Sequence, residues 1–222
     1  ISNIFLVCIM GLCMFGCKNK TTNPSPELAS INLLRGELVI CSSEQFGDVS
    51  FSLSCSYETQ ETFDLALSLL HSFEYAEAEK AFVQVIDMDP DCAMAYWGVS
   101  MSIFHTLWMQ SDLSYLAKGQ KLLKIAKTLP MNDREKDYID AISIFYKDWD
   151  KLSKLERQLL YETKMEALHN KYKEDTEAAV LYALAIRATA NPNDKTFSKQ
   201  KKAGKILDSL FVLNPNHPGV AH

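Results

Sequence analysis

Apolar residues recur at helical spacing along most of the chain from about residue 58 onward, with polar and charged residues between them. A spacing of three and four residues places these side chains on one face of a helix. Proline and short polar runs interrupt the pattern, as expected where helices end. The pattern predicts amphipathic helices over residues 113–129, 133–149, 153–172 and 175–190, separated at Pro130, 148–150 and 191–194.

One short stretch, residues 46–57, has the alternation of a β-strand instead. Val49, Phe51 and Leu53 fall on one face, and aspartate and serine fall on the other. The preceding GELVIC could pair with it as a hairpin. We therefore expect a short β-strand or hairpin cap over residues 37–57, in front of a helical domain that covers residues 58–222.

The first helical stretch carries apolar residues at fixed places and a proline at its close. Between residues 62 and 90, Ala78 is small where two helices would cross, Phe82 would fill the space beside it, and Pro90 would stop the second helix. This arrangement resembles the tetratricopeptide repeat, a helix-turn-helix of 34 residues. The resemblance implies a right-handed α-solenoid of about four helix pairs, which we expect to continue beyond His222.

Self-similarity supports the repeat. A shift of 34 residues places Phe63 on Trp97 and His71 on His105. Near the end, Ala203, Leu207 and Pro215 repeat the spacing of Ala78, Phe82 and Pro90. An isolated first repeat would expose the side that a preceding repeat normally covers, which gives the expected strand a role as a cap.

In repeats of this type the first helix of each pair lines a concave groove. The expected lining is two stripes with a histidine beside each: Phe63, Leu67, Leu70 and His71 on one helix, and Trp97, Met101, Phe104, His105 and Trp108 on the next. Such a groove could hold an apolar peptide or ligand. We therefore expect a protein or peptide partner, bound by a scaffolding or recognition module.

The histidines are the main hint of other chemistry. His71, His105 and His222 occupy related groove positions in the repeat register and could together bind a transition metal in a metal- or small-ligand-binding protein. Neighbouring helices would hold the backbones about 9–10 Å apart, so a hydrogen-bonded structural role is the main expectation for each, and no cofactor is expected. His169 and His217 read as surface and turn residues.

The first seventeen residues form an apolar run of the size found in signal peptides. Residues 14–17, MFGC, resemble the lipobox of bacterial lipoproteins, although Met14 replaces the usual leucine. The resemblance implies that Cys17 carries lipid, followed by a flexible linker over residues 18–36. An ordinary cleaved signal or a truncated membrane anchor is the alternative. Each alternative exports the protein, and the lipoprotein would lie in the bacterial cell envelope, facing the periplasm or the outside.

Export would permit a disulfide among the remaining cysteines, Cys41, Cys55 and Cys92. From the residues alone, a hairpin would favour Cys41 with Cys55, whereas adjacent first helices would favour Cys55 with Cys92. The phrases LLHSFEYAEAEKAF, DPDCAMAYWG and HPGVAH resemble a group of exported bacterial repeat proteins. That resemblance implies the pairing of Cys55 with Cys92.

Charge and motifs narrow the function classes. The formal net charge is -5, with both signs interspersed, so there is no basic stripe for a nucleic acid. Residues 92–110 contain no charge, which is typical of a helix buried on all sides and, alternatively, of a membrane span. The buried helix is favoured, so membrane contact is expected through the lipid anchor only. No phosphate loop or nucleophile motif is present, and we expect no enzyme activity.

Overall fold

The computed structural model describes residues 26–40, 46–108 and 112–222. In these ranges the protein is helical and contains no strand, in agreement with the all-α prediction. The expected signal, linker start, Cys17 and Cys41 lie outside the described residues. The elements are α1 (Pro26–Ala29), the 3-10 helix η2 (Tyr57–Thr59), α2 (Gln60–His71), α3 (Tyr75–Met88), α4 (Ala93–Ser102), α5 (Leu113–Ala126), α6 (Asp133–Tyr146), α7 (Lys154–Lys171), α8 (Thr176–Ala188), α9 (Ser198–Phe211) and α10 (Pro218–Ala221).

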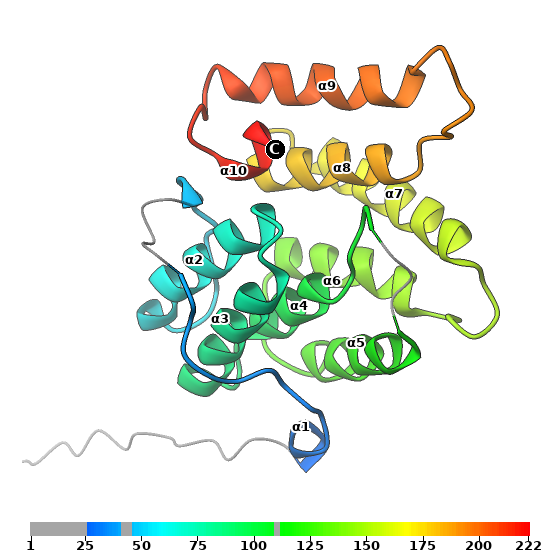
Figure 1. Cartoon of the computed structure of the whole chain (residues 1–222). Coiled ribbons are helices and arrows are strands. Elements are labelled where there is room, and N and C mark those ends of the chain that lie inside the picture. The colour runs from blue at the N-terminus through cyan, green and yellow to red at the C-terminus, as the bar shows by residue number, and fades with distance from the viewer. Residues whose placement is uncertain (1–25, 41–45, 109–111) are drawn as a thin grey trace, which may run out of the picture.

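Consecutive helices pack as pairs, as the repeat pattern predicts. Helix α2 packs on α3, α4 on α5, α6 on α7 and α8 on α9 (Figure 1). The first helices of successive pairs also touch, α2 with α4 and α4 with α6. The helices predicted over 153–172 and 175–190 are confirmed as α7 and α8. Local capping explains where α7 starts, because Ser153 and Glu156 form a capping box at its N-terminus.

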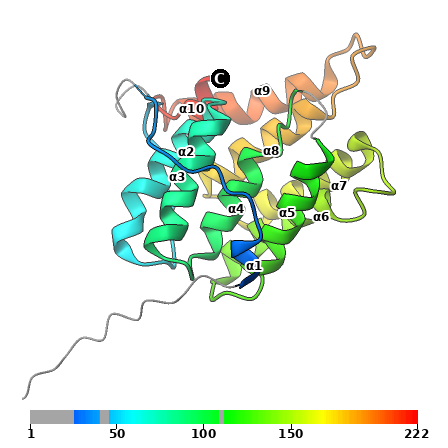
Figure 2. The ribbon, with the colours of Figure 1, turned by 60° about the horizontal axis from the view of Figure 1, so that its bottom comes forward.

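The last helix closes the array onto its beginning. Helix α10 packs against α9 and α8, and also against α2. In Figure 1, α8, α9 and α10 lie together at the top, with α2–α6 below them; Figure 2 shows the same arrangement from another side. An array in which each helix pair touched only its neighbours would keep α2 apart from α10. The side of α2 on which the groove was expected is therefore covered by α10.

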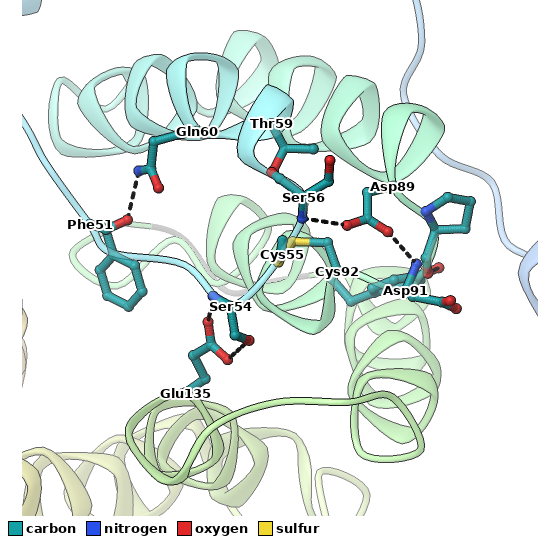
Figure 3. Close-up of a disulfide and its surroundings, with 12 residues drawn as sticks. Phe51, Ser54, Cys55, Ser56, Thr59, Gln60, Asp89, Asp91, Cys92 and Glu135 are labelled. Carbon is teal, nitrogen blue, oxygen red and sulfur yellow. Dashed lines mark hydrogen bonds between the residues drawn. A yellow bond between two sulfur atoms is a disulfide. The ribbon is translucent and has the colours of Figure 1, made fainter. Parts of the chain in front are cut away.

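The strand expected over residues 46–57 is wrong. Residues 48–53 have no regular structure, and side chains of the helices take the backbone hydrogen bonds that a partner strand would supply (Figure 3). The Phe51 amide donates to Asp64, and the Gln60 amide group donates to the Phe51 carbonyl oxygen. The Ser54 amide donates to Glu135. The apolar alternation that predicted a strand instead reflects the burial of Phe51.

Phe51 is completely buried and joins helices from three pairs. Its ring centroid lies 5.6 Å from that of Phe63, 6.3 Å from Trp97 and 5.3 Å from Tyr138. The guanidinium of Arg134 lies 3.9 Å from the centre of the Phe51 ring, a cation–π contact. Residues 48–53, which have no regular structure, thus contribute Phe51 to the core between the helices.

The pairing of Cys55 with Cys92 is confirmed. The two Cα atoms are 5.0 Å apart, within the usual range for a disulfide. Cys55 precedes η2 and Cys92 is the N-cap residue of α4 (Figure 3). The bond therefore ties the irregular segment to the second helix pair, and it excludes the alternative pairing of Cys55 with Cys41.

The described part of the expected linker also differs from the prediction. Leu28 in α1, Ile31 and Leu33 are each at most 9% exposed and belong to the core cluster. The Leu34 amide donates to Glu79 in α3. Residues 28–34 are therefore attached to the body, and a free linker is wrong for this part of the chain. This stretch is too short for a strand-like or helix-like spacing of apolar residues to indicate such packing.

Residues 92–104 of the uncharged stretch are interior. All ten residues of α4 are buried, with Gly98 closely covered by the Phe82 ring. Among the described residues, no helix combines the length and the apolar character needed to cross a bilayer. The buried-helix interpretation of this stretch is thus supported.

We expect reduction of the Cys55–Cys92 bond to lower the free energy of unfolding by about 2–4 kcal/mol, because the bond closes a loop in the unfolded chain. The sequence separation is 37 residues. Urea denaturation of a Cys55→Ser/Cys92→Ser variant, compared with the oxidised protein, measures this change. The variant should keep its helical circular dichroism in buffer. An unchanged unfolding midpoint would contradict the role of the bond as a clamp.

Candidate functional site

A cavity lies where the closing helix meets the first pair. Its volume is about 310 Å³. It is bordered by α2, α3, α4, α8, α9 and α10, by the turn between α2 and α3, and by the loop after α4. Most of its wall is apolar. The apolar residues at its border include Leu70, Met101, Val180, Leu181, Ala183, Leu184, Ala203 and Leu207, and the polar ones are His71, Thr106, Arg187, Gln200 and His222.

Aromatic side chains gather at one border of the cavity. The ring centroids of Phe73 and Trp108 are 4.8 Å apart in an edge-to-face arrangement, and His222 stacks on Phe73 at 6.0 Å. Trp108 is 50% exposed. Phe73 has a φ of 63°, a left-handed conformation that glycine adopts more easily than phenylalanine. The ring contacts offset this backbone cost, so the turn between α2 and α3 presents an aromatic ring.

Next to the cavity, two histidines share one buried glutamate. His71 is the last residue of α2, Glu177 lies in the first turn of α8, and His217 is the N-cap of α10. Nε2 of His71 lies 2.6 Å from one Glu177 oxygen, and Nε2 of His217 lies 2.6 Å from the other. The three side chains are at most 5% exposed. This His71–Glu177–His217 cluster connects three helices that are far apart in sequence.

The electrostatics of the cluster favour an ionised glutamate. Burial by itself raises the pKa of Glu177, but the charge of His71 and the hydrogen bonds from both imidazoles outweigh it and lower the pKa to about 2. The N-terminal end of α8 adds favourable helix-dipole interactions. The Gly219 amide donates to Nδ1 of His217 at 3.1 Å, so this ring carries its proton on Nε2 and donates it to Glu177.

The structure divides the predicted groove residues into two groups. Leu70, His71 and Met101 border the cavity. The others lie elsewhere: Phe63, Leu67, Trp97 and Phe104 are completely or almost completely buried in the core, and Trp108 lies at the surface. Phe51 packs against Phe63 in α2 and Trp97 in α4, so this side of both helices is covered. An open apolar stripe along α2 and α4 therefore does not form.

The predicted set of His71, His105 and His222 is not brought together. Helix α4 ends at Ser102, three residues before His105, whereas α2 runs to His71 itself. The His105 ring packs against Tyr75, with centroids 4.5 Å apart, and burial lowers the pKa of His105. Equal position in the repeat thus does not give equal position in space.

His222 does reach the cavity border. Its Nδ1 lies 3.3 Å from the His71 carbonyl oxygen. The interpretation of His217 as a turn residue is correct for its backbone but wrong for its side chain, which is buried. Glu177 was not singled out in the sequence. Its place in a stretch with few charges, EAAVLYALAI, was the available signal, because a carboxylate beside a buried helix face needs a partner.

No family model matches this chain, and neither a curated protein nor a solved structure shows a match.

We predict that Gly219→Ala lowers the free energy of unfolding by about 1–3 kcal/mol, because the added methyl group overpacks the junction. A Cβ at Gly219 would lie 2.5 Å from Nδ1 of His71 and 2.6 Å from Cγ1 of Val180. The change should displace α10 from α2 and α8. Thermal and urea unfolding monitored by circular dichroism provide the measurement.

Gly204→Ala is the matched control, since Gly204 also borders the cavity. A Cβ at this position in α9 meets nothing within 4 Å. The substitution should stabilise the protein by up to about 1 kcal/mol through helix propensity. Equal stability changes for the two substitutions would argue against close packing of α10.

Proposed function

We propose that this chain is an exported helical-repeat protein that binds a partner protein through an apolar anchor side chain seated in the cavity. The single observation that carries the proposal is the cavity of about 310 Å³, with its apolar wall and aromatic border. Cavities that bind ligands are mostly apolar and carry a few polar groups. This one combines both features at the junction of six helices.

The size and the border of the cavity favour a partner that inserts one anchor side chain over a partner that lies in the cavity as an extended segment. Its volume is at the lower end of the range typical of ligand sites, so one or two side chains would fill it. Binding energy in protein interfaces concentrates in anchors of this kind, surrounded by aromatic contacts. Phe73 borders the cavity, and Trp108 packs edge-to-face against Phe73, so this pair of rings offers such contacts.

The positive charge of Arg187 at the cavity border favours a partner that carries an acidic group next to its anchor side chain. Arg187 is exposed at the end of α8, and among the described residues it forms no ion pair. An arginine in this state can bind a carboxylate in a bidentate manner. We therefore propose a partner segment in which an aromatic or aliphatic residue lies near an aspartate or glutamate.

The cellular setting is part of the same proposal. The Cys55–Cys92 disulfide is consistent with an oxidising compartment outside the cytoplasm. The apolar residues 1–17 and the lipobox-like MFGC support a lipid anchor at Cys17 in the bacterial envelope. The paired helices support a right-handed solenoid of tetratricopeptide type as the architecture, with a binding role and no catalysis.

Filling the cavity should abolish partner binding. Gly204→Trp places a large side chain in the cavity from a position where the Cβ itself is unhindered. Peptides selected on the wild-type protein from a phage-displayed random library should carry an apolar residue near an acidic one. We expect Gly204→Trp to weaken their binding, measured by fluorescence anisotropy, by about tenfold or more, as for the loss of a central anchor.

Gly204→Ala serves as the control, because it alters helix propensity and leaves most of the space open. It should bind the selected peptides with wild-type affinity, and Arg187→Glu should weaken only those with an acidic residue. The proposal fails if the selection yields no binder, or if the selected peptides bind Gly204→Trp as tightly as the wild-type protein.

A further inference from the structure

The His71–Glu177–His217 cluster offers three metal-ligating atoms from three separate elements. One ligand atom from each residue lies within 4.8 Å of the other two. Among the described residues, this is the set of three histidine, cysteine or acidic side chains that meets such a spacing. Imidazole nitrogen together with a carboxylate oxygen is a donor set typical of zinc and related transition metals.

Burial makes the charge of this cluster unusual. Glu177 is 3% exposed, and its ion-pair partners among the described residues are the two histidines alone. His217 is neutral in its present tautomer, because Nδ1 accepts from the Gly219 amide. An ionised carboxylate in the interior is costly unless positive charge or hydrogen-bond donors lie beside it. The two imidazoles fill that role here, and a divalent metal would supply positive charge directly.

We propose that the protein binds one divalent transition metal of the zinc type through Nε2 of His71, Nε2 of His217 and a carboxylate oxygen of Glu177. Metal binding replaces both Nε2–H hydrogen bonds to Glu177. In a neutral ring the proton moves from Nε2 to Nδ1, and any imidazolium loses one proton to solvent. For His217 this exchange gives up the Gly219 hydrogen bond, so metal binding is coupled to the start of α10.

Three protein ligands leave the coordination of a zinc-type ion incomplete. Structural zinc sites have four protein ligands, whereas sites with three retain a position for water or another ligand. His71 belongs to the cluster and also borders the cavity. The remaining position is therefore available to water or to a small donor ligand.

The test is a calorimetric titration of the untagged protein with Zn²⁺ after treatment with a chelator. The chain has six cysteines, so free thiols are first alkylated without reducing the disulfide. We expect one equivalent of Zn²⁺ to bind to the wild-type protein. Glu177→Gln keeps the size of the side chain and removes its charge, and it should weaken Zn²⁺ binding by about tenfold or more.

His105→Asn is the matched control, since it removes a histidine that lies outside the cluster. His105 has a φ of 45°, a conformation that asparagine tolerates well. It should bind Zn²⁺ like the wild-type protein. The proposal is overturned if the alkylated wild-type protein binds no stoichiometric Zn²⁺, or if a folded Glu177→Gln variant binds it equally well.

Substitution with Co²⁺ decides the matter on the wild-type protein if Glu177→Gln does not fold. Visible absorption bands of low-coordinate Co²⁺ that saturate at one equivalent and disappear on addition of Zn²⁺ would support the site. A spectrum that stays that of hydrated Co²⁺ would refute it. The peptide measurements with Gly204→Trp do not depend on metal, so the two proposals can fail independently.

Discussion

The contact of Glu177 with both His71 and His217 joins α8 and α10 to the first helix pair through buried hydrogen bonds. These residues are separated by 106 and 40 positions along the chain, and each hydrogen bond measures 2.6 Å. Because the carboxylate is buried, losing either partner would leave an uncompensated polar group in the interior. The contact therefore joins α8 and α10 to α2, and residues of all three helices border the cavity.

The other end of the fold depends on a segment without regular structure. Residues 46–56 bring Phe51 into the core, and their backbone groups are bound by Asp64, Gln60 and Glu135. An unpaired backbone group in such a place would be costly, and these side chains remove the cost. The disulfide at Cys55 then fixes the same segment to α4. The first helix pair is thus covered by irregular chain on one side and by α10 on another.

The features predicted from the sequence are those that depend on local spacing. Helices such as α7 follow from amphipathic periodicity and from the capping pair Ser153 and Glu156. Pairing of consecutive helices follows from short connections, and the disulfide was implied by resemblance to exported repeat proteins. For the helices and their pairing, the information lies within about one repeat of sequence; the disulfide pairing came from the resemblance and not from spacing.

The features that were missed depend on contacts between distant residues. The alternation around Phe51 has the period of a strand, but no partner strand exists within the described residues, and helix side chains take its place. Position in the repeat could not reveal that α4 stops before His105. Likewise, no local pattern shows that Glu177 meets two histidines, because that contact requires α10 to return to α2.

Energetics suggest why such a junction is polar. A buried ionic cluster generally contributes less stability than well-packed apolar side chains of the same size, because its groups lose their hydration. Apolar contacts between α2, α8 and α10 would therefore close the array at lower cost. A junction built from two imidazoles and a carboxylate instead fixes one register of the three helices, since only that register satisfies every donor and acceptor. It also places two imidazoles and a carboxylate within 4.8 Å of one another beside the cavity, a set of donor atoms that an apolar junction would not provide.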